Sequence, residues 1–220
     1  MRAYHFIPSK YGIENIRRKR LKISRLDDLN DPFELLSLKL PDKKLRTIFL
    51  KIKTELNATR GILCFSEDWR SPVMWSHYAE KHKGLCLEFE IPDEFMAKIN
   101  YSQSRLKREL KEIFDEKSVT KELAISRILT TKFAHWKYEQ ERRMFVGLDT
   151  PDNDGLYFFD FSEQLKLTGI IVGPRSSVSR KELNDAIEFA EIKNPISTFK
   201  SRLAFSSFRI VKNQDQSLWQ

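Results

Sequence analysis

The sequence predicts an α+β fold in a single domain over residues 1–220. Segments with the two-residue period of a strand and segments with the helical period both occur along the chain. They follow one another irregularly, which favours α+β over the regular strand–helix alternation of a parallel sheet. The length of 220 residues, with 40% hydrophobic residues and only seven glycines, fits one sizeable core without a long linker.

The first part of the chain mixes short strands with helices. Residues 3–7 are apolar and aromatic and end at Pro8, so a strand is expected, and Ser9 is expected to cap a helix to about Arg18. Leu85, Leu87 and Phe89 alternate with polar residues, as in a strand with one buried face. The predicted elements after the first helix are a strand over 21–26, a turn over 27–32, a helix over 45–56, a strand over 61–65, a helix over 72–80 and a strand over 84–91.

The second part opens with a long charged helical stretch over about residues 104–133, with a break near Lys117. Ser179 and Glu182 have the spacing of a capping box, which predicts a helix from there to about Glu191. Strands are expected over 144–147, 156–161, 167–172 and 203–211.

Composition favours a cytoplasmic protein. The first residues are too polar for a signal peptide, and no apolar run approaches the roughly 20 residues that span a bilayer. Cys64 and Cys86 are the two cysteines, and each is expected to lie reduced in a strand. The net charge is +8, from 39 Lys and Arg against 31 Asp and Glu. This surplus suits a polyanion such as nucleic acid, and it equally suits a merely soluble basic surface.

The residues that could carry chemistry gather in short polar and aromatic blocks. His5 lies in the opening strand, where it is either a core residue or a ligand donor. Ser66 ends a predicted strand, and Trp75, His77 and Tyr78 follow on a short helix. Trp75 and Tyr78 are three residues apart and share a helix face, either as a core anchor or as a platform for a flat ring such as a base or nicotinamide.

A zinc site from Cys64, His77, His82 and Cys86 is disfavoured, because these residues lack the C-x-x-C or H-E-x-x-H spacing of such sites. A Gly-rich phosphate loop, a G-x-G-x-x-G fingerprint and a nucleophile elbow are absent from the sequence as well.

Glu139 and Glu141 come directly before the predicted strand over 144–147. Two residues apart in extended chain, they are expected to point the same way across the pleat. They are either surface partners of the neighbouring arginines or carboxylates at the lip of a cleft, where one could stabilise positive charge that develops on a sugar ring.

Together these blocks resemble a bacterial family of unknown function that includes abortive-infection (AbiG-type) phage-resistance proteins. The family in turn is distantly similar to ADP-ribosyltransferases. The blocks that carry the resemblance span most of the chain in order: Tyr4-His5-Phe6, Asn30-Asp31-Pro32-Phe33-Glu34, Cys64-Phe65-Ser66, Met74-Trp75-Ser76-His77-Tyr78-Ala79, Lys83-Gly84-Leu85-Cys86, Trp136-Lys137-Tyr138-Glu139-Gln140-Glu141-Arg142 and Ile170-Ile171-Val172-Gly173-Pro174.

The resemblance implies a mostly antiparallel, split β-sheet with flanking helices that clamps NAD. By this resemblance His5 binds the adenosine-side ribose, Ser66 supports the nicotinamide side and Tyr78 stacks. Glu141 stabilises the oxocarbenium-like transition state, and Glu139 orients the acceptor. The usual aromatic spacing of the middle block is not cleanly present here.

The expected function is therefore cleavage of NAD and modification of an intracellular target, with nucleic acid suggested by the charge. A toxin or phage-defence role, and a partner protein that inhibits it, are implied by the resemblance alone. One alternative is a non-enzymatic nucleic-acid-binding module, in which aromatic and basic side chains contact bases and phosphates. Its residues would be Trp75, Tyr78, Trp136, Arg17, Arg18, Lys19, Arg20, Arg142 and Arg143. The other is a nuclease that uses His5, His77 and Glu141.

Overall fold

The computed structural model describes residues 1–31, 33, 37–40, 43–106 and 120–219. Its strands are β1 (Arg2–Ile7), β2 (Arg20–Lys22), β3 (Ser24–Arg25), β4 (Arg60–Ser66), β5 (Leu85–Glu90), β6 (Ala97–Lys98), β7 (Asn100–Ser102), β8 (Thr131–Phe133), β9 (Glu141–Gly147), β10 (Phe158–Asp160), β11 (Lys166–Val172), β12 (Ser197–Leu203) and β13 (Ile210–Lys212). Its helices are α1 (Ser9–Arg17), α2 (Lys43–Thr59), α3 (Pro72–Tyr78), α5 (Thr120–Leu129) and α6 (Arg180–Phe189). Four 3₁₀ turns complete them: η1 (Leu26–Asp28), η2 (Asp93–Phe95), η3 (Ala134–Glu139) and η4 (Gln216–Leu218).

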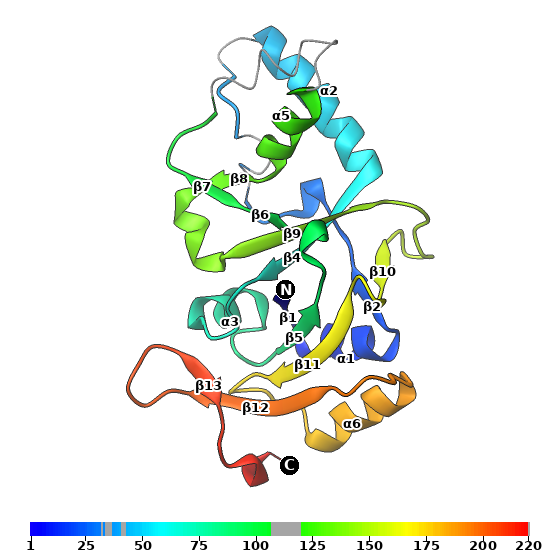
Figure 1. Ribbon diagram of the computed structural model, residues 1–220, viewed down its shortest axis with the longest axis vertical. Helices are drawn as coiled ribbons and strands as arrows, with labels where there is room; N and C mark the ends of the chain where they lie inside the picture. The colour runs from blue at the N-terminus through cyan, green and yellow to red at the C-terminus, as the bar shows by residue number, and fades with distance from the viewer. Residues whose placement is uncertain (32, 34–36, 41–42, 107–119, 220) are drawn as a thin grey trace.

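A nine-stranded sheet runs along the long axis of the molecule (Figure 1). Its strand order is β13-β12-β11-β5-β1-β4-β9-β6, with β3 paired to β4. Among the described strands of this sheet, β11 and β12 pair in parallel, across the α6 connection, and the other pairings are antiparallel. Two small sheets lie apart from it, the parallel pair β7–β8 and the antiparallel pair β2–β10. The prediction of an α+β fold with a mostly antiparallel sheet is thus confirmed.

The sheet is nearly divided in its middle. β1 pairs with β5 over all six of its residues, but its pairing with β4 is recorded at one position, Tyr4 with Ser66. On its other side β4 pairs with β9 over seven residues. The two halves of the sheet therefore diverge beyond the Tyr4–Ser66 pair, and the side chains along β1 and β4 border the opening.

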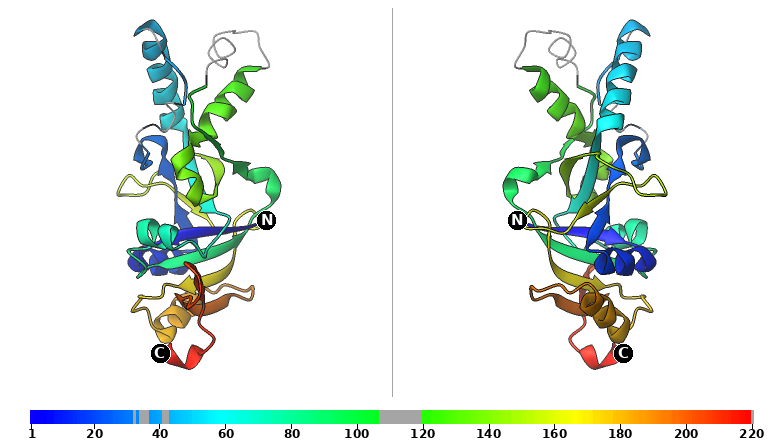
Figure 2. Two further views of the ribbon diagram at one scale, coloured as in Figure 1. Left: turned by 90° about the vertical axis from the view of Figure 1, so that its left-hand side faces the viewer. Right: turned by 90° about the vertical axis from the view of Figure 1, so that its right-hand side faces the viewer.

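Three clusters of buried apolar residues surround the sheet. Leu85, Leu87 and Phe89 of β5 face the largest cluster, beneath α1 and α6, as their alternation predicts. Cys86, between them, faces a second cluster around α3. A third joins α2 and α5, which project beyond one end of the sheet (Figure 2). None of the described helices is both long and apolar enough to cross a membrane.

Several predicted boundaries are wrong for local reasons. α1 is capped at Pro8, and the hydroxyl of Ser9 donates to the carbonyl of Lys83 instead. α3 ends at Tyr78, because Glu80, Lys81 and His82 adopt left-handed backbone angles, with φ of 50°, 53° and 72°. By contrast Ser179 does cap α6, since its hydroxyl accepts from the Glu182 amide at 3.0 Å.

Two longer predictions are corrected as well. Within the expected helix over 104–133, residues 107–119 lie outside the described residues, α5 covers Thr120–Leu129 and Thr131–Phe133 form the strand β8. The expected strand over 203–211 is a hairpin, in which the loop over 204–209 joins β12 to β13.

Candidate functional site

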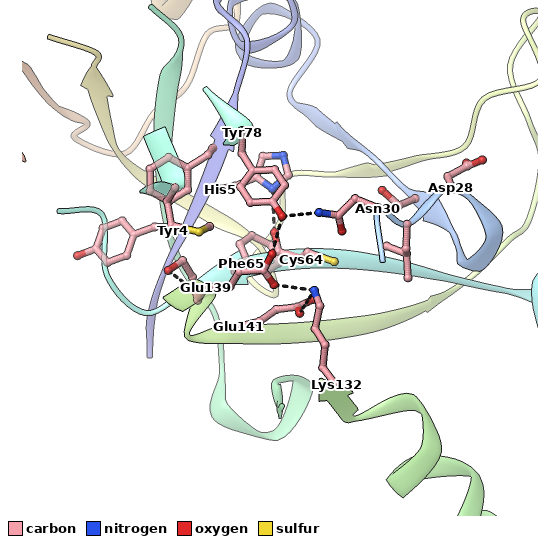
Figure 3. A pocket seen from close by; sticks show the side chains of 15 residues that line it. Tyr4, His5, Asp28, Asn30, Cys64, Phe65, Tyr78, Lys132, Glu139 and Glu141 are labelled. Atoms are coloured by element: carbon pink, nitrogen blue, oxygen red, sulfur yellow. Dashed lines mark hydrogen bonds and ion pairs between the residues drawn. The ribbon is translucent and has the colours of Figure 1, made fainter. Parts of the chain in front are cut away.

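The opening between β1 and β4 forms a cavity of about 230 Å³. Its lining comes from β1, β4, α3, η1, β8 and the Glu139–Glu141 segment, so it gathers residues that are far apart in the sequence (Figure 3). Five of the seven predicted site residues line it: His5, Ser66, Tyr78, Glu139 and Glu141.

A left-handed residue brings the two carboxylates together. Glu139 is the last residue of η3 and Glu141 is the first of β9, so they do not both lie in the extended strand that the sequence predicts. Gln140 between them has φ 44° and ψ 50°, in the left-handed region that non-glycine residues seldom adopt. This turn, rather than the pleat of a strand, aims both side chains into the cavity.

One ammonium group bridges the pair. Lys132 Nζ of β8 lies 2.6 Å from Glu139 Oε2 and 3.0 Å from Glu141 Oε2 (Figure 3). Arg143 contacts Glu141 with two nitrogens, Nε at 2.7 Å and Nη2 at 3.1 Å, and its Nη1 donates to the carbonyl of Leu129. All four side chains are at most 5% exposed. Such a buried cluster persists because each charge has an opposite partner at hydrogen-bond distance.

Sequence reasoning missed both cations. Lys132 is one of 39 basic residues and lies seven positions before Glu139, so nothing in its spacing sets it apart. Arg143 did carry a signal. It follows Glu141 by two positions in a strand, which places both on one face, but the spacing alone does not tell an exposed surface pair from a buried one.

The pKa values of the two carboxyl groups shift in opposite directions. Burial raises the pKa of Glu141, but the guanidinium of Arg143 and the ammonium of Lys132 outweigh burial and hold it at about 2. Burial also raises the pKa of Glu139, and there Lys132 and the Tyr78 hydroxyl offset it only in part, so the pKa stays above its usual range. Divergent pKa values in one pair of carboxyl groups are typical of sites that divide acid–base roles.

Tyr78 links the carboxylate pair to the opposite side of the cavity. Its hydroxyl donates to Glu139 Oε1 at 2.5 Å and accepts from Asn30 Nδ2 at 2.6 Å. Burial, followed by the negative charge of Glu139, raises the pKa of Tyr78, so the hydroxyl keeps its proton as a donor. With its hydroxyl held in this way, Tyr78 lines the cavity as a positioned side chain.

His5 and Ser66 border the split itself. The Nδ1 of His5 lies 3.0 Å from the Cys64 carbonyl, which can only accept, so Nδ1 carries the proton. Burial lowers the pKa of His5, and the ring is then neutral with Nε2 as an acceptor. The hydroxyl of Ser66 donates to the Glu139 carbonyl at 2.7 Å and accepts from the Asp68 amide, so Ser66 fixes the backbone of the carboxylate turn.

Trp75 and His77 correct the sequence-based expectation. Trp75 is fully buried, packs edge-on against Phe6 and donates its indole N–H to the Trp69 carbonyl, so it anchors α3 to the core. His77 faces away on the exposed side of α3, where its Nδ1 lies 3.1 Å from the Tyr138 hydroxyl. Neither side chain lines the cavity.

The two alternative functions, a nucleic-acid-binding module and a nuclease, fit this arrangement less well. The nucleic-acid-binding alternative needs exposed side chains to contact bases and phosphates, but two of its residues, Trp75 and Arg143, are at most 1% exposed. A nuclease would have to join His5, His77 and Glu141, but His77 lies outside the cavity that holds the other two. Within the described part of the chain, no group of three His, Cys, Asp or Glu side chains is placed to hold a metal ion. Cys64 and Cys86 lie unpaired in β4 and β5.

Comparison with known proteins shows that part of the chain is similar to a family. Residues 74–144 match a family model described as "Protein of unknown function (DUF2971)". The matched segment runs from α3 through the first half of β9, so it holds Tyr78, Lys132, Glu139, Glu141 and Arg143. Neither the curated proteins nor the solved structures yield a match. Over these residues the chain is therefore similar to a family of unknown function, as the sequence blocks predicted.

Proposed function

We propose that this protein is an ADP-ribosyltransferase-like enzyme that cleaves the N-glycosidic bond of NAD in the split-sheet cavity. The observation that carries the proposal is the pair Glu139 and Glu141, two buried carboxyl groups that face the cavity and share the ammonium of Lys132. Their pKa values are shifted in opposite directions. The division of the sheet at the Tyr4–Ser66 pair supports it, because a split antiparallel sheet is the architecture that the sequence resemblance implies.

Cleavage of this bond needs no proton transfer to the leaving group. When the bond between C1′ of the ribose and the pyridinium nitrogen breaks, its electron pair stays on nitrogen and nicotinamide leaves neutral. Positive charge then develops on the ribose ring, which an ionised carboxylate can stabilise. Glu141 suits this role, since its low pKa keeps it charged at neutral pH and Arg143 fixes its orientation from the buried side.

The second carboxylate suits the proton transfer. A nucleophile that attacks C1′, whether water or a hydroxyl of a target molecule, must release a proton. Glu139, with its raised pKa, is the better acceptor of the two, because a base is most effective when its pKa approaches the working pH. The Tyr78 hydroxyl holds this carboxylate in place, and the Tyr78 ring offers the surface on which nicotinamide stacks.

The remaining groups bind the dinucleotide. The Nε2 of His5 can accept a hydrogen bond from a ribose hydroxyl, while Ser66 acts indirectly through the backbone of Glu139. NAD is larger than a single cavity of about 230 Å³. A neighbouring cavity of about 280 Å³ shares Lys132 and adds Arg105, Ser102 and Ser104, which suit the pyrophosphate.

The biological role follows from the resemblance and from charge. The likeness to abortive-infection proteins supports a toxin or phage-defence role, in which ADP-ribose is transferred to an intracellular target. The net charge of +8 favours nucleic acid as that target.

Release of nicotinamide from NAD by the purified protein tests the proposal, alone and with nucleic acid or cell lysate. Release that Glu141→Gln abolishes and that Glu67→Gln leaves intact is the expected result. Glu67 is a suitable control because it is an exposed glutamate that pairs with Arg142 at 2.5 Å, close to the same strand. Absence of release under all these conditions would overturn the assignment of NAD chemistry.

A further inference from the structure

The hairpin between β12 and β13 carries two phenylalanines at its tip. Phe205 and Phe208 are 94% and 97% exposed, more than any other large apolar side chain described in the chain. The hairpin is closed beside them by the Ala204 amide, which donates to the Arg209 carbonyl at 2.9 Å. A single exposed apolar residue needs no explanation, but a pair on one ordered tip is typical of a surface that binds something.

The hairpin is also purely basic. Residues 197–213 include Lys200, Arg202, Arg209 and Lys212 and contain no aspartate or glutamate. The loop projects to one side of the molecule, away from α6 at the other end of β12 (Figure 1). Aromatic side chains among cations of one sign suit a partner that is both negatively charged and rich in flat rings.

A cleft of about 420 Å³ lies alongside the hairpin, between it and the segment that holds Trp69 and Arg70. It is lined by two aromatic rings and three cations, without a carboxylate: Trp69, Phe205, Arg70, Arg202 and Lys212, with small polar and apolar residues between them. The cations lie over rings. The guanidinium of Arg202 is 4.4 Å from the Phe205 ring centre, and that of Arg70 is 5.1 Å from the Trp69 ring centre. A base that stacks on such a ring places its phosphate beside the arginine.

The cleft is joined to the cavity by one segment of chain. β4 ends at Ser66 in the cavity lining, and Trp69 and Arg70 follow in the cleft lining. The hairpin is fastened to this segment by the Ile210 amide, which donates to the Arg70 carbonyl at 2.9 Å, and by the pair of Arg209 with Asp68 at 2.8 Å. The cleft and the carboxylate cavity therefore lie at opposite ends of the segment from Ser66 to Arg70.

We propose that the β12–β13 hairpin and its cleft bind single-stranded nucleic acid, with Phe205 and Phe208 stacking on bases and Arg70, Arg202 and Lys212 contacting phosphates. A single strand is favoured over a duplex, because its bases are free to stack on side chains. It is favoured over an anionic membrane, because insertion of two phenylalanines would leave the ring–cation cleft without a role. The site shares no residue with the NAD proposal, so it stands whether or not NAD is cleaved.

Fluorescence anisotropy with a labelled oligonucleotide of about 20 nucleotides tests the site, in single-stranded form and as a duplex of the same sequence. The double variant Phe205→Ala/Phe208→Ala should bind the single strand at least about tenfold more weakly, as the loss of two stacked bases implies. Arg202→Ala should lower the slope of log affinity against log salt by about 0.7, the share of one phosphate.

Matched controls come from α6. Phe189→Ala removes a phenylalanine that is 74% exposed, and Lys181→Ala removes an exposed cation, both away from the hairpin. Neither control should change the affinity. All variants should keep the thermal unfolding midpoint of the wild type, since the altered side chains are exposed or, for Arg202, half-buried. NAD cleavage without an acceptor should be unchanged in the hairpin variants.

Three results would overturn the proposal. The first is wild-type protein that does not bind the single strand at low salt. The second is an equal loss of affinity in Phe189→Ala and in the hairpin double variant. The third is sedimentation with phosphatidylglycerol vesicles that the double variant abolishes while its affinity for the single strand is unchanged, which would assign the hairpin to a membrane surface.

Discussion

The carboxylates of Glu139 and Glu141 meet on a single ammonium, that of Lys132, at 2.6 and 3.0 Å. They are separated by one residue in the left-handed conformation, Gln140. Their pKa values shift in opposite directions, because Arg143 adds a second cation at Glu141. Two carboxyl groups of one turn therefore differ in their acid–base properties. The proposed function depends on this difference, and so do the following predictions.

Lys132→Met should destabilise the protein by about 3–5 kcal/mol, because it leaves buried negative charge without its partner. Lys132→Met/Glu139→Gln removes one charge of each sign and should cost less than the sum of the two single variants, by about 0.5–3 kcal/mol. Denaturant unfolding of the four proteins measures this coupling. Lys137→Met, at an exposed position in η3, is the matched control and should be close to neutral. Strict additivity would show that the cluster does not share the ammonium.

Stability should depend on pH in opposite directions through the two carboxyl groups. The pKa of Glu141 falls from 4.5 to about 2 on folding, so its contribution of about 3 kcal/mol is complete above about pH 4.5 and is lost as the pH falls through 2. The pKa of Glu139 is raised, so its charge reduces stability as the pH rises from 4.5 through the folded pKa.

Unfolding of wild type, Glu141→Gln and Glu139→Gln from about pH 7 to about pH 2.5 separates the two effects. The advantage of wild type over Glu141→Gln should be constant near neutrality and should shrink below about pH 4.5. The stability of the wild type relative to Glu139→Gln should increase as the pH falls. If the Glu141→Gln difference shrank already near neutral pH, Glu141 would not be the carboxylate with the low pKa.

Tyr78→Phe should move the pH dependence of catalysis. Loss of the hydroxyl removes a donor to the charged form of Glu139, so the pKa of Glu139 should rise and the acidic limb of kcat should shift to higher pH. Tyr11→Phe removes the hydroxyl of an exposed tyrosine in α1 instead and should leave the limb in place. An unchanged limb in Tyr78→Phe would separate Glu139 from the rate-limiting proton transfer.

Arg105→Ala tests whether the second cavity holds the pyrophosphate. If Arg105 binds a phosphate equally in the ground state and the transition state, KM for NAD should rise about tenfold or more while kcat changes little. Steady-state kinetics with NAD and with nicotinamide riboside separates the effects, because the riboside has no phosphates and should be insensitive to the variant. A fall in kcat for both substrates would contradict this placement of the dinucleotide.

What the sequence could predict was local. The alternation of Leu85, Leu87 and Phe89 placed them on one buried face, and the spacing of Ser179 and Glu182 marked the start of α6. Trp75 and Tyr78 share a short helix, but only the tertiary packing decides that the tryptophan enters the core and the tyrosine enters the cavity. At the hairpin tip, Phe205 and Phe208 have the residue type typical of a strand, and only the pairing of β12 with β13 shows that they lie in the loop between them.

The site shows the same limit. Residue type and sequence block were enough to single out His5, Ser66, Tyr78, Glu139 and Glu141. They were not enough for Lys132, because only the folded position of β8 brings this lysine to the carboxylates. The left-handed Gln140 gave no signal either, since neither glycine nor asparagine marks the position.

The most direct test of the central claim is single-turnover release of nicotinamide from NAD at neutral pH by wild type, Glu141→Gln and Glu67→Gln. The account predicts a rate for Glu141→Gln that is lower by about 10²-fold or more, with Glu67→Gln equal to wild type. The folded fraction of each protein, measured by unfolding at the same pH, guards against a loss that is only structural. Equal rates for wild type and a folded Glu141→Gln would contradict the claim that this carboxylate stabilises the developing charge.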